Sequence, residues 1–262
     1  MMRALYTAAS GMNAQQANID NIANNLANVN TTGFKKSHVE FEDLVYQQTK
    51  VPGTPTSAAG EAPVGLETGM GVRSVASPRD FSRGNMRSTS GPLDLAIEGD
   101  GLFQVVLPSG DTGYTRAGSF HLSAEGGLVT DDGYPLQPQI TIPENATSVS
   151  ISKDGIVSAS IAGQSAVQEL GTIELASFRN SAGLRATGGN LFEATTASGE
   201  ATVGAPGADG RGTIAQGYVE DSNVSVAEEM VNMILSQRAY EANSKVLKAA
   251  DDMQQQVNAL VR

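Results

Sequence analysis

The sequence contains no cysteine, no tryptophan and only two histidines among its 262 residues. The absence of cysteine excludes a disulfide framework, a thiolate metal site and a thiol nucleophile. With His38 and His121 as the only histidines, we do not expect a histidine-rich metal site. The net charge of −11 argues against general nucleic-acid binding, because that role requires a basic surface. No apolar run approaches the ~20 residues of a membrane span, and Met1–Met12 makes a poor secretory signal. We therefore expect no membrane insertion and no cleaved signal peptide.

Proline and glycine are nearly missing from both ends of the chain. All ten prolines and all but two of the 29 glycines lie within residues 52–217, the exceptions being Gly11 and Gly33. Charge follows the same division, with a net charge of 0 on residues 1–51, −8 on residues 52–217 and −3 on residues 218–262. This distribution predicts helical ends around a turn-rich, acidic middle.

The N-terminal segment carries two apolar rows with heptad spacing, as in a coiled coil. The rows are Leu5, Met12, Ile19 and Leu26, and, offset by three, Ala8, Gln15, Ile22 and Val29. The other faces carry many asparagines and glutamines and few charges. Uncharged amides suit a helix that is surrounded by other protein, including neighbouring copies. The alternative is an ordinary amphipathic helix packed on its own domain. We expect Gly33 to end this helix as its C-cap.

The C-terminal segment has a similar pattern and no glycine or proline within residues 218–262. We predict one helix of about 35 residues, which starts near Ser222 or Ser225 and is far longer than a typical globular helix. Its apolar rows are Leu235, Ala242 and Ala249, and Ala239, Val246, Met253 and Leu260.

The middle of the chain alternates short β-type runs with Asp-Gly and other turn signals, which predicts antiparallel hairpins. The fold class is therefore α+β, with long terminal helices paired as a coiled coil and a β-rich sandwich or partial barrel between them. We assign residues 1–46 and 218–262 to the helical core, 47–72 to an extended loop or hairpin, and 73–217 to the β-rich domain.

Two features of the middle could suggest chemistry, and both have simpler explanations. Gly99-Asp100-Gly101 lacks the third glycine of a dinucleotide-binding loop and is followed by strand residues, so we interpret it as a turn. The carboxylates Asp94, Glu98 and Asp100 could be imagined as a glycosidase pair, but acidic turn residues at a sheet rim explain them. We expect no catalytic, cofactor-binding or metal-binding residue and no cofactor.

Five stretches carry a resemblance to one protein family. They are LYTAASGM (5–12), NNLANVNTTGFK (24–35), LDLAIEGDGLF (93–103), YTRAGSF (114–120) and SQRAYEAN (236–243). The chain resembles the bacterial flagellar rod and hook family, and within it the distal rod members. The opening stretch and the segment from Tyr46 to Gly71 resemble the distal rod version, and 262 residues leave no room for the extra domain of the longer hook protein.

The resemblance implies a structural subunit that polymerises helically into the hollow drive shaft between motor and hook, and not an enzyme. It implies residence in the basal body, as a rod in the periplasm, after export without a cleaved signal. The implied partners are other copies of the chain, hook and proximal rod proteins, the surrounding ring proteins and the flagellar type III export apparatus. The alternatives are a proximal rod or hook subunit, or a secreted β-rich carbohydrate-active enzyme.

The predicted functional residues fall into two groups. The expected assembly interface consists of Leu5, Met12, Ile19, Ile22, Leu26, Val29, Leu235, Ala239, Ala242, Val246, Ala249, Met253 and Leu260. The motif that carries the family resemblance consists of Asn24, Asn25, Leu26, Ala27, Asn28, Thr32, Gly33, Phe34 and Lys35.

Overall fold

The computed structural model describes residues 2–53, 55–57, 60–61, 63–162 and 166–260, without the side chains of residues 2, 55–57, 60–61 and 260. The chain divides into two compact units. The first, here called the helical unit, comprises residues 1–26, 37–78 and 225–262. The second, here called the sheet unit, comprises residues 27–36 and 79–224.

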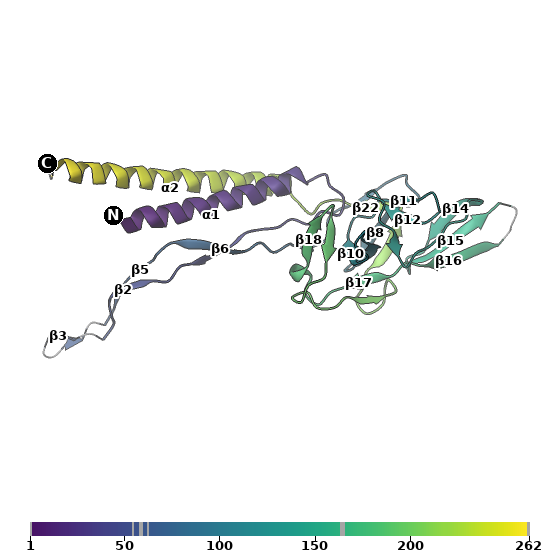
Figure 1. Cartoon of the computed structure of the whole chain (residues 1–262), viewed down its shortest axis with the longest axis horizontal. Helices are drawn as coiled ribbons and strands as arrows, with labels where there is room; N and C mark the ends of the chain where they lie inside the picture. Colours follow the sequence, from purple (N-terminus) through teal and green to yellow (C-terminus); the bar gives the residue numbers. More distant parts are fainter. Residues whose placement is uncertain (1, 54, 58–59, 62, 163–165, 261–262) are drawn as a thin grey trace. The chain divides into compact units, whose positions relative to one another are not determined.

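Two long helices, α1 (Met2–Ala27) and α2 (Val226–Leu260), make up most of the helical unit. They lie side by side with both chain ends at the same end of the pair, so they run antiparallel (Figure 1). α2 has the 35 residues that the sequence predicts and begins directly after Ser225, with Glu228 and Glu229 in its first turn. These carboxylates favour the start of the helix because its N-terminal end carries a partial positive charge. Winding of the two helices into a coiled coil stays a prediction.

α1 ends at Ala27, six residues before the predicted C-cap at Gly33, so that prediction was wrong. Beyond Ala27 the chain forms successive turns, in which the Thr31 amide donates to the Asn28 carbonyl at 3.1 Å. The Thr31 hydroxyl also donates to the Asn28 side chain at 3.2 Å. Asparagine and threonine side chains offer such local hydrogen bonds in place of the helical ones, which explains the early end of the helix.

The remainder of the helical unit is a long two-stranded antiparallel ribbon between residues 40 and 76 (Figure 1). Its pairs nest inside one another, with β1 against β6, β2 against β5 and β3 against β4. The strand bounds are β1 Glu40–Asp43, β2 Gln47–Lys50, β3 Pro55–Ser57, β4 Gly60–Glu61, β5 Leu66–Thr68 and β6 Val72–Ala76. The ribbon thus extends beyond both ends of the predicted hairpin at 47–72.

The sheet unit is built from antiparallel strands, as the sequence predicts. A seven-stranded sheet has the order β18-β19-β10-β9-β17-β20, with β13 also paired to β9. Its strands are β9 Leu102–Val106, β10 Thr112–Thr115, β13 Leu136–Gln137, β17 Leu175–Ser177, β18 Arg185–Gly188, β19 Leu191–Glu193 and β20 Thr202–Gly204.

Smaller sheets complete this unit, namely the three-stranded β14-β15-β16 and the pairs β7–β22, β8–β21 and β11–β12. A short 3-10 helix, η1 (Ser181–Gly183), precedes β18. The strands are β7 Met86–Ser88, β8 Leu95–Glu98, β11 Phe120–Leu122, β12 Leu128–Thr130, β14 Ala146–Ile151, β15 Ile156–Ile161, β16 Val167–Thr172, β21 Thr213–Gln216 and β22 Tyr218–Glu220. Residues 218–220, expected to belong to the helical core, instead form strand β22 and pair with β7.

The side chains of β9 point alternately to the two faces of the seven-stranded sheet, and each face carries a hydrophobic cluster. Phe103 and Val105 enter the larger cluster, in which the Phe103 and Phe120 rings meet edge to face at 5.1 Å. Leu102 points to the other face and joins Tyr114 and Phe192 in a smaller cluster. Successive strand residues point to opposite faces, so one strand serves both clusters. Residues 99–101 follow β8 directly, and Gly99 and Gly101 have positive φ values of 131° and 138°, which supports the interpretation as a turn.

Candidate assembly interface

The surface where α1 meets α2 contains a row of polar contacts. The Asn18 amide donates to the Ser236 hydroxyl at 2.8 Å, and the Asn25 amide donates to the Glu229 carboxylate at 3.3 Å. Asn25, Glu229 and Ser236 are all buried. Asn18 and Asn25 are seven residues apart, as are Glu229 and Ser236, so each contact lies two helical turns from the next.

Gly11 continues the same row of α1 by another seven residues and lies opposite Asn243. A Cβ atom at Gly11 would come within 2.8 Å of the Asn243 Nδ2 atom. Glycine inside a helix costs about 1 kcal/mol relative to alanine. The close approach of Asn243 leaves little room for a side chain and explains why glycine stands at position 11 despite this cost. We call Gly11, Asn18, Asn25, Glu229, Ser236 and Asn243 together the polar interface.

Asn25, near the start of the motif at residues 24–35, also forms hydrogen bonds with the segment after α1 that returns to the helical unit at Ser37. Its amide donates to the Ser37 carbonyl at 2.8 Å, and the Ser37 amide donates back to the Asn25 Oδ1 atom at 3.1 Å. One turn earlier, the Asn21 amide donates to the Ser37 hydroxyl at 2.8 Å. A side-chain amide has a donor and an acceptor on separate atoms and can therefore make both hydrogen bonds to one backbone residue, which suits asparagine at position 25.

The predicted interface residues of α2 lie mostly away from the polar interface. Leu235 is 62% exposed, and Val246 and Met253 are each 50% exposed. Ala242 and Ala249 are exposed and Ala239 is half-buried. The side chain of Leu260 lies outside the described residues. Most of these positions are exposed, and their role in contacts between copies stays a prediction.

The predicted interface residues of α1 are better covered. Ile22 is buried, while Leu5, Met12, Ile19 and Leu26 are half-buried. Val29 is half-buried in the turns of the sheet unit. All of them except Ile22 therefore keep part of their apolar surface accessible.

The ribbon adds a second exposed apolar surface to the helical unit. Val45 is 85%, Val64 75% and Leu66 59% exposed, and Tyr46 is about half exposed. An isolated two-stranded ribbon is marginally stable in water, so these side chains need another surface to cover them. Large clustered apolar exposure of this kind marks interaction surfaces.

The end of the motif lies in the sheet unit and forms a buried charge cluster. The Lys35 ammonium donates to the Glu220 carboxylate at 2.7 Å and to the Ser82 carbonyl at 2.6 Å. The Arg116 guanidinium contacts the other Glu220 oxygen at 2.5 Å and also donates to the carbonyl groups of Ile97, Gly99 and Gly101. Lys35 is 1% and Glu220 2% exposed. Two cations and one anion are thus buried together and held by backbone carbonyls.

The pKa values of this cluster follow from burial and pairing. Burial lowers the pKa of Lys35, with the Glu220 carboxylate opposing that shift. Burial by itself would raise the pKa of Glu220, but Arg116 and Lys35 together outweigh it and leave this pKa below its ordinary value. The carboxylate is therefore held ionised between its two cations.

Glu220 also connects three separate stretches of the sheet unit. Its carboxylate accepts the Gly84 amide at 2.8 Å, and its backbone carbonyl accepts the Gly33 amide at 2.7 Å. Gly33 has a φ of 70°, and a Cβ atom there would meet the Ala117 amide nitrogen at 2.4 Å, so a side chain at this position would clash. Next to it, Phe34 is buried, with the Arg79 guanidinium 5.8 Å from its ring centre.

The other motif residues have more modest roles. Asn24 and Ala27 are exposed, and Asn28 is half-buried in the turn described above. The Thr32 carbonyl accepts a hydrogen bond from the Asn190 amide at 3.0 Å. The second half of the motif thus ties the chain into the sheet unit through its backbone and through Lys35.

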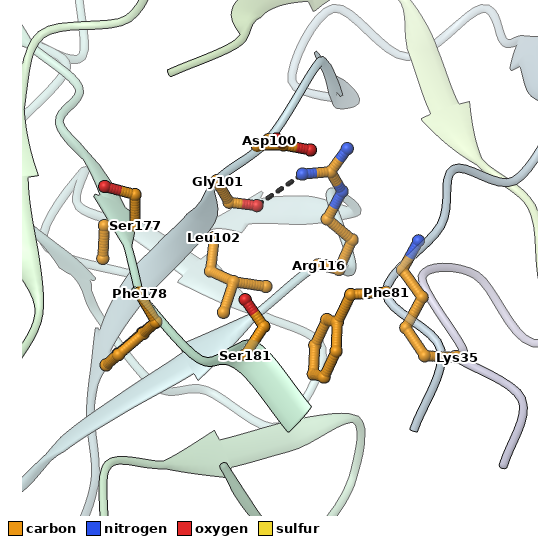
Figure 2. Close-up of a pocket in the computed structure, with 10 residues that line it drawn as sticks. Lys35, Phe81, Asp100, Gly101, Leu102, Arg116, Ser177, Phe178 and Ser181 are labelled. Atoms are coloured by element: carbon orange, nitrogen blue, oxygen red, sulfur yellow. Dashed lines mark hydrogen bonds between the residues drawn. The ribbon is translucent and has the colours of Figure 1, made fainter. Parts of the chain in front are cut away.

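The cavity beside the charge cluster is too small for a substrate site. Its volume is about 90 Å³, and Figure 2 shows Arg116 turned toward the Gly101 carbonyl, with Phe81, Phe178 and Leu102 around the same space. Ligand pockets usually measure ~300–1,000 Å³. Both cations that border it are already hydrogen-bonded to Glu220.

Other chemical candidates are also ordinary surface groups. His121 lies 2.7 Å from Asp131, with both side chains exposed, and His38 is exposed near Glu40. Glu98 and Asp100 are exposed and Asp94 is half-buried. Among the residues that the structure describes, no group of three or more His, Cys, Asp or Glu could hold a metal ion. In the same part of the chain, no helix is long and apolar enough to cross a membrane.

Neither the polar interface nor the charge cluster was predicted from the sequence. A search for apolar periodicity passes over the row Gly11, Asn18 and Asn25, although its spacing of seven was visible. Lys35, Arg116 and Glu220 are far apart in the chain, and no local pattern connects them.

Three family models match separate parts of the chain. Residues 5–35 match the flagella basal body rod protein, residues 96–159 the flagellar hook protein FlgE/F/G D1 domain, and residues 215–260 the flagellar basal body rod FlgEFG protein C-terminal region.

Similarity to curated proteins extends over the whole chain. The flagellar basal-body rod protein FlgG of Borreliella burgdorferi is 51% identical across all of both chains. The proteins of the same name are 49% identical over 99% of both chains in Caulobacter vibrioides and 40% identical over all of both in Bacillus subtilis. With full-length identity at this level, the chain belongs to the flagellar basal-body rod protein family.

Proposed function

We propose that this chain is a structural subunit of the flagellar distal rod and not an enzyme. In this proposal the subunits polymerise helically into the hollow shaft that crosses the periplasm and carries motor torque to the hook. The main observation in support is the exposed apolar face of α2, with Leu235, Val246 and Met253, in a chain whose relatives are rod proteins over their full length. The partner that covers this face is another copy of the chain.

The proposal also assigns the neighbours of the shaft. Its ends contact proximal rod proteins and hook protein, and its outer surface faces the ring proteins. The chain reaches this position through the flagellar type III export apparatus, as an unfolded chain without a cleaved signal. The complete lack of cysteine is consistent with transit between redox compartments.

In the same proposal, the exposed apolar residues of the ribbon contact neighbouring subunits. We assign the segment 47–72 to contacts with neighbouring copies, which stiffen the shaft. The support is its unusual composition of exposed apolar side chains, among them Val45 just before the segment and Val64 and Leu66 within it.

The proposal is tested by placing a charge in the apolar rows. Leu26→Asp and Met253→Asp should each abolish polymerisation, measured by sedimentation against protein concentration, because an interface would bury an unpaired carboxylate. Motility should also be lost. The sheet unit should still unfold at the same denaturant concentration. The matched control is Met253→Leu, which keeps the apolar surface and should polymerise normally. Rods built from both Asp variants would contradict the proposed interface.

A further inference from the structure

Strand pairing in the sheet unit joins residues over two very different distances along the chain. β11 pairs with β12, β14 with β15 and β15 with β16, each with its neighbour in the chain. β7 and β8, which begin the unit's strands, instead pair with β22 and β21, which end them. The sheet unit is thus closed by strands from the two ends of its own sequence.

The charge cluster lies where these two ends meet. Lys35 and Glu220 are 185 positions apart in the chain, and Arg116 and Glu220 are 104 positions apart. The Gly84 amide, which donates to the same carboxylate at 2.8 Å, is 136 positions away. Glu220, at the end of β22, is therefore the residue where three earlier stretches of the sheet unit meet its last strand.

The two cations of the cluster cannot be buried stably before Glu220 joins them. Lys35 is 1% and Arg116 5% exposed, and Glu220 is the carboxylate that contacts both. Burial lowers the pKa of Lys35, and the nearby Arg116 lowers it further, so the two cations repel each other. Burying charges without their counterion is strongly unfavourable. The folded positions of Lys35 and Arg116 are therefore accessible only after Glu220 has arrived.

We propose that Glu220 is the closing residue of the sheet unit, so that the ends of the unit lock together after its local strand pairs have formed. Contacts between distant residues form late because a long stretch of chain must first be confined, whereas neighbouring strands meet at once. Each end also needs the other, since β7 and β8 have their pairing partners in β22 and β21.

This order of folding gives the cluster a role during export, and that consequence rests on the proposed function. Lys35 precedes every described strand of the sheet unit, and Glu220 ends the last one. Whichever end of the chain leaves first, most of the chain must be transferred before both residues are on the same side. The sheet unit therefore stays open until transfer is nearly complete, which keeps the remaining chain in the unfolded form that the proposed export requires.

The order of folding can be measured in the full-length monomer, without export or polymerisation. Hydrogen-exchange pulses at successive times after dilution from urea, read by mass spectrometry of peptides, show when each segment becomes protected. We expect residues 146–161 in an early phase, because the three-stranded sheet has an apolar face and can persist alone. Residues 33–36 and 95–98 should be protected at least about tenfold more slowly, together with residues 213–220.

Glu220→Gln tests whether the charges control the late phase. It should slow that phase at least about tenfold and leave the early phase unchanged, because Lys35 and Arg116 must then be buried without their anion. Lys35→Met added to Glu220→Gln removes one of the two uncompensated cations and should restore part of the rate. The matched control is Glu98→Gln, at an exposed carboxylate of the same unit, which should change neither phase.

The outcomes separate closure by Glu220 from a general loss of stability. A late phase that is abolished by Glu220→Gln while residues 146–161 are still protected early would support the proposal as strongly as a slowed one. Protection of all segments in one phase, or a late phase that Glu220→Gln leaves unchanged, would overturn it. No recovery on adding Lys35→Met would also overturn it. Rod assembly does not enter these measurements, so the folding order and the proposed function are tested separately.

Discussion

The two units of the chain bury their apolar residues to very different degrees. The sheet unit contains two hydrophobic clusters with fully buried side chains such as Phe103, Leu95 and Ile173. In the helical unit the buried positions are mainly small or polar, among them Ala8, Ala14 and Ser236. Its large apolar side chains, such as Leu235 and Val45, are mostly exposed.

This difference indicates where the folding free energy of each unit comes from. Burial of apolar surface is the main stabilising contribution in folding, and the sheet unit obtains it within one chain. The helical unit has polar pairing and helical hydrogen bonds, which contribute only ~0.5–1.5 kcal/mol each in net terms. Its apolar surface is available for burial against other molecules. We therefore expect the sheet unit to be stable in the monomer and the helical unit to gain most of its stability on assembly.

The largest effect on the monomer should come from the charge cluster of the sheet unit. Glu220→Gln leaves Lys35 and Arg116 buried without their anion, and such a loss typically costs ~3–5 kcal/mol. The free energy of unfolding, measured by urea denaturation, should fall by about that amount. The control is Glu98→Gln at an exposed carboxylate, with an expected change of less than ~0.5 kcal/mol. Equal effects of the two substitutions would show that the cluster does not stabilise the sheet unit.

The sequence predicted the architecture better than the contacts within it. The length and start of α2 were predicted correctly, and strands form on either side of Gly99–Gly101 as expected, since helical periodicity and Asp-Gly turns are local signals. These two strands do not form the expected hairpin, because β8 pairs with β21, and β9 pairs with β10 and β17. The end of α1 was wrong because hydrogen bonds of Asn28 and Thr31 compete with the helix. Pairs such as Lys35 with Glu220 form only in the tertiary structure, because the two residues lie 185 positions apart and no local sequence pattern connects them.

The comparison between the units can be tested with the same substitution in each. Leu95→Ala, at a side chain with 0% exposure in the sheet unit, should cost ~2–5 kcal/mol because it leaves a cavity. Leu235→Ala, at 62% exposure in α2, should change the unfolding free energy of the monomer by less than ~0.5 kcal/mol.

Leu235→Ala should affect polymerisation more strongly than it affects the stability of the monomer. Leu235→Ala removes apolar surface from the proposed interface, so the protein concentration required for sedimenting polymer should rise clearly above that of the unmodified chain. A monomer destabilised by Leu235→Ala as much as by Leu95→Ala would contradict the division between the two units.

A smaller effect is expected from pH. The pKa of Glu220 in the folded chain lies below its ordinary value of 4.5, so the folded state favours the ionised carboxylate. Its contribution to stability is complete above pH 4.5 and decreases as pH falls through the folded pKa. Urea denaturation at a series of pH values between 3 and 7 measures this decrease. The difference between the unmodified chain and Glu220→Gln should narrow toward the acidic end, and a difference that stays constant with pH would argue against an ionised Glu220.

The smallest effect on the monomer, and the clearest one on the polymer, should follow deletion of residues 47–72. Every described side chain of β2 and β5 is exposed, so the monomer loses little buried surface and its unfolding free energy should change by less than ~0.5 kcal/mol. β1 and the remainder of β6, from Arg73 to Ala76, can still pair between Glu42 and Arg73, which also form an ion pair at 2.8 Å. Rods of the shortened chain should be more flexible, measured as a shorter persistence length in electron micrographs. Straight rods of unchanged stiffness would show that this segment has no part in contacts between copies, and its exposed apolar residues would then need another partner.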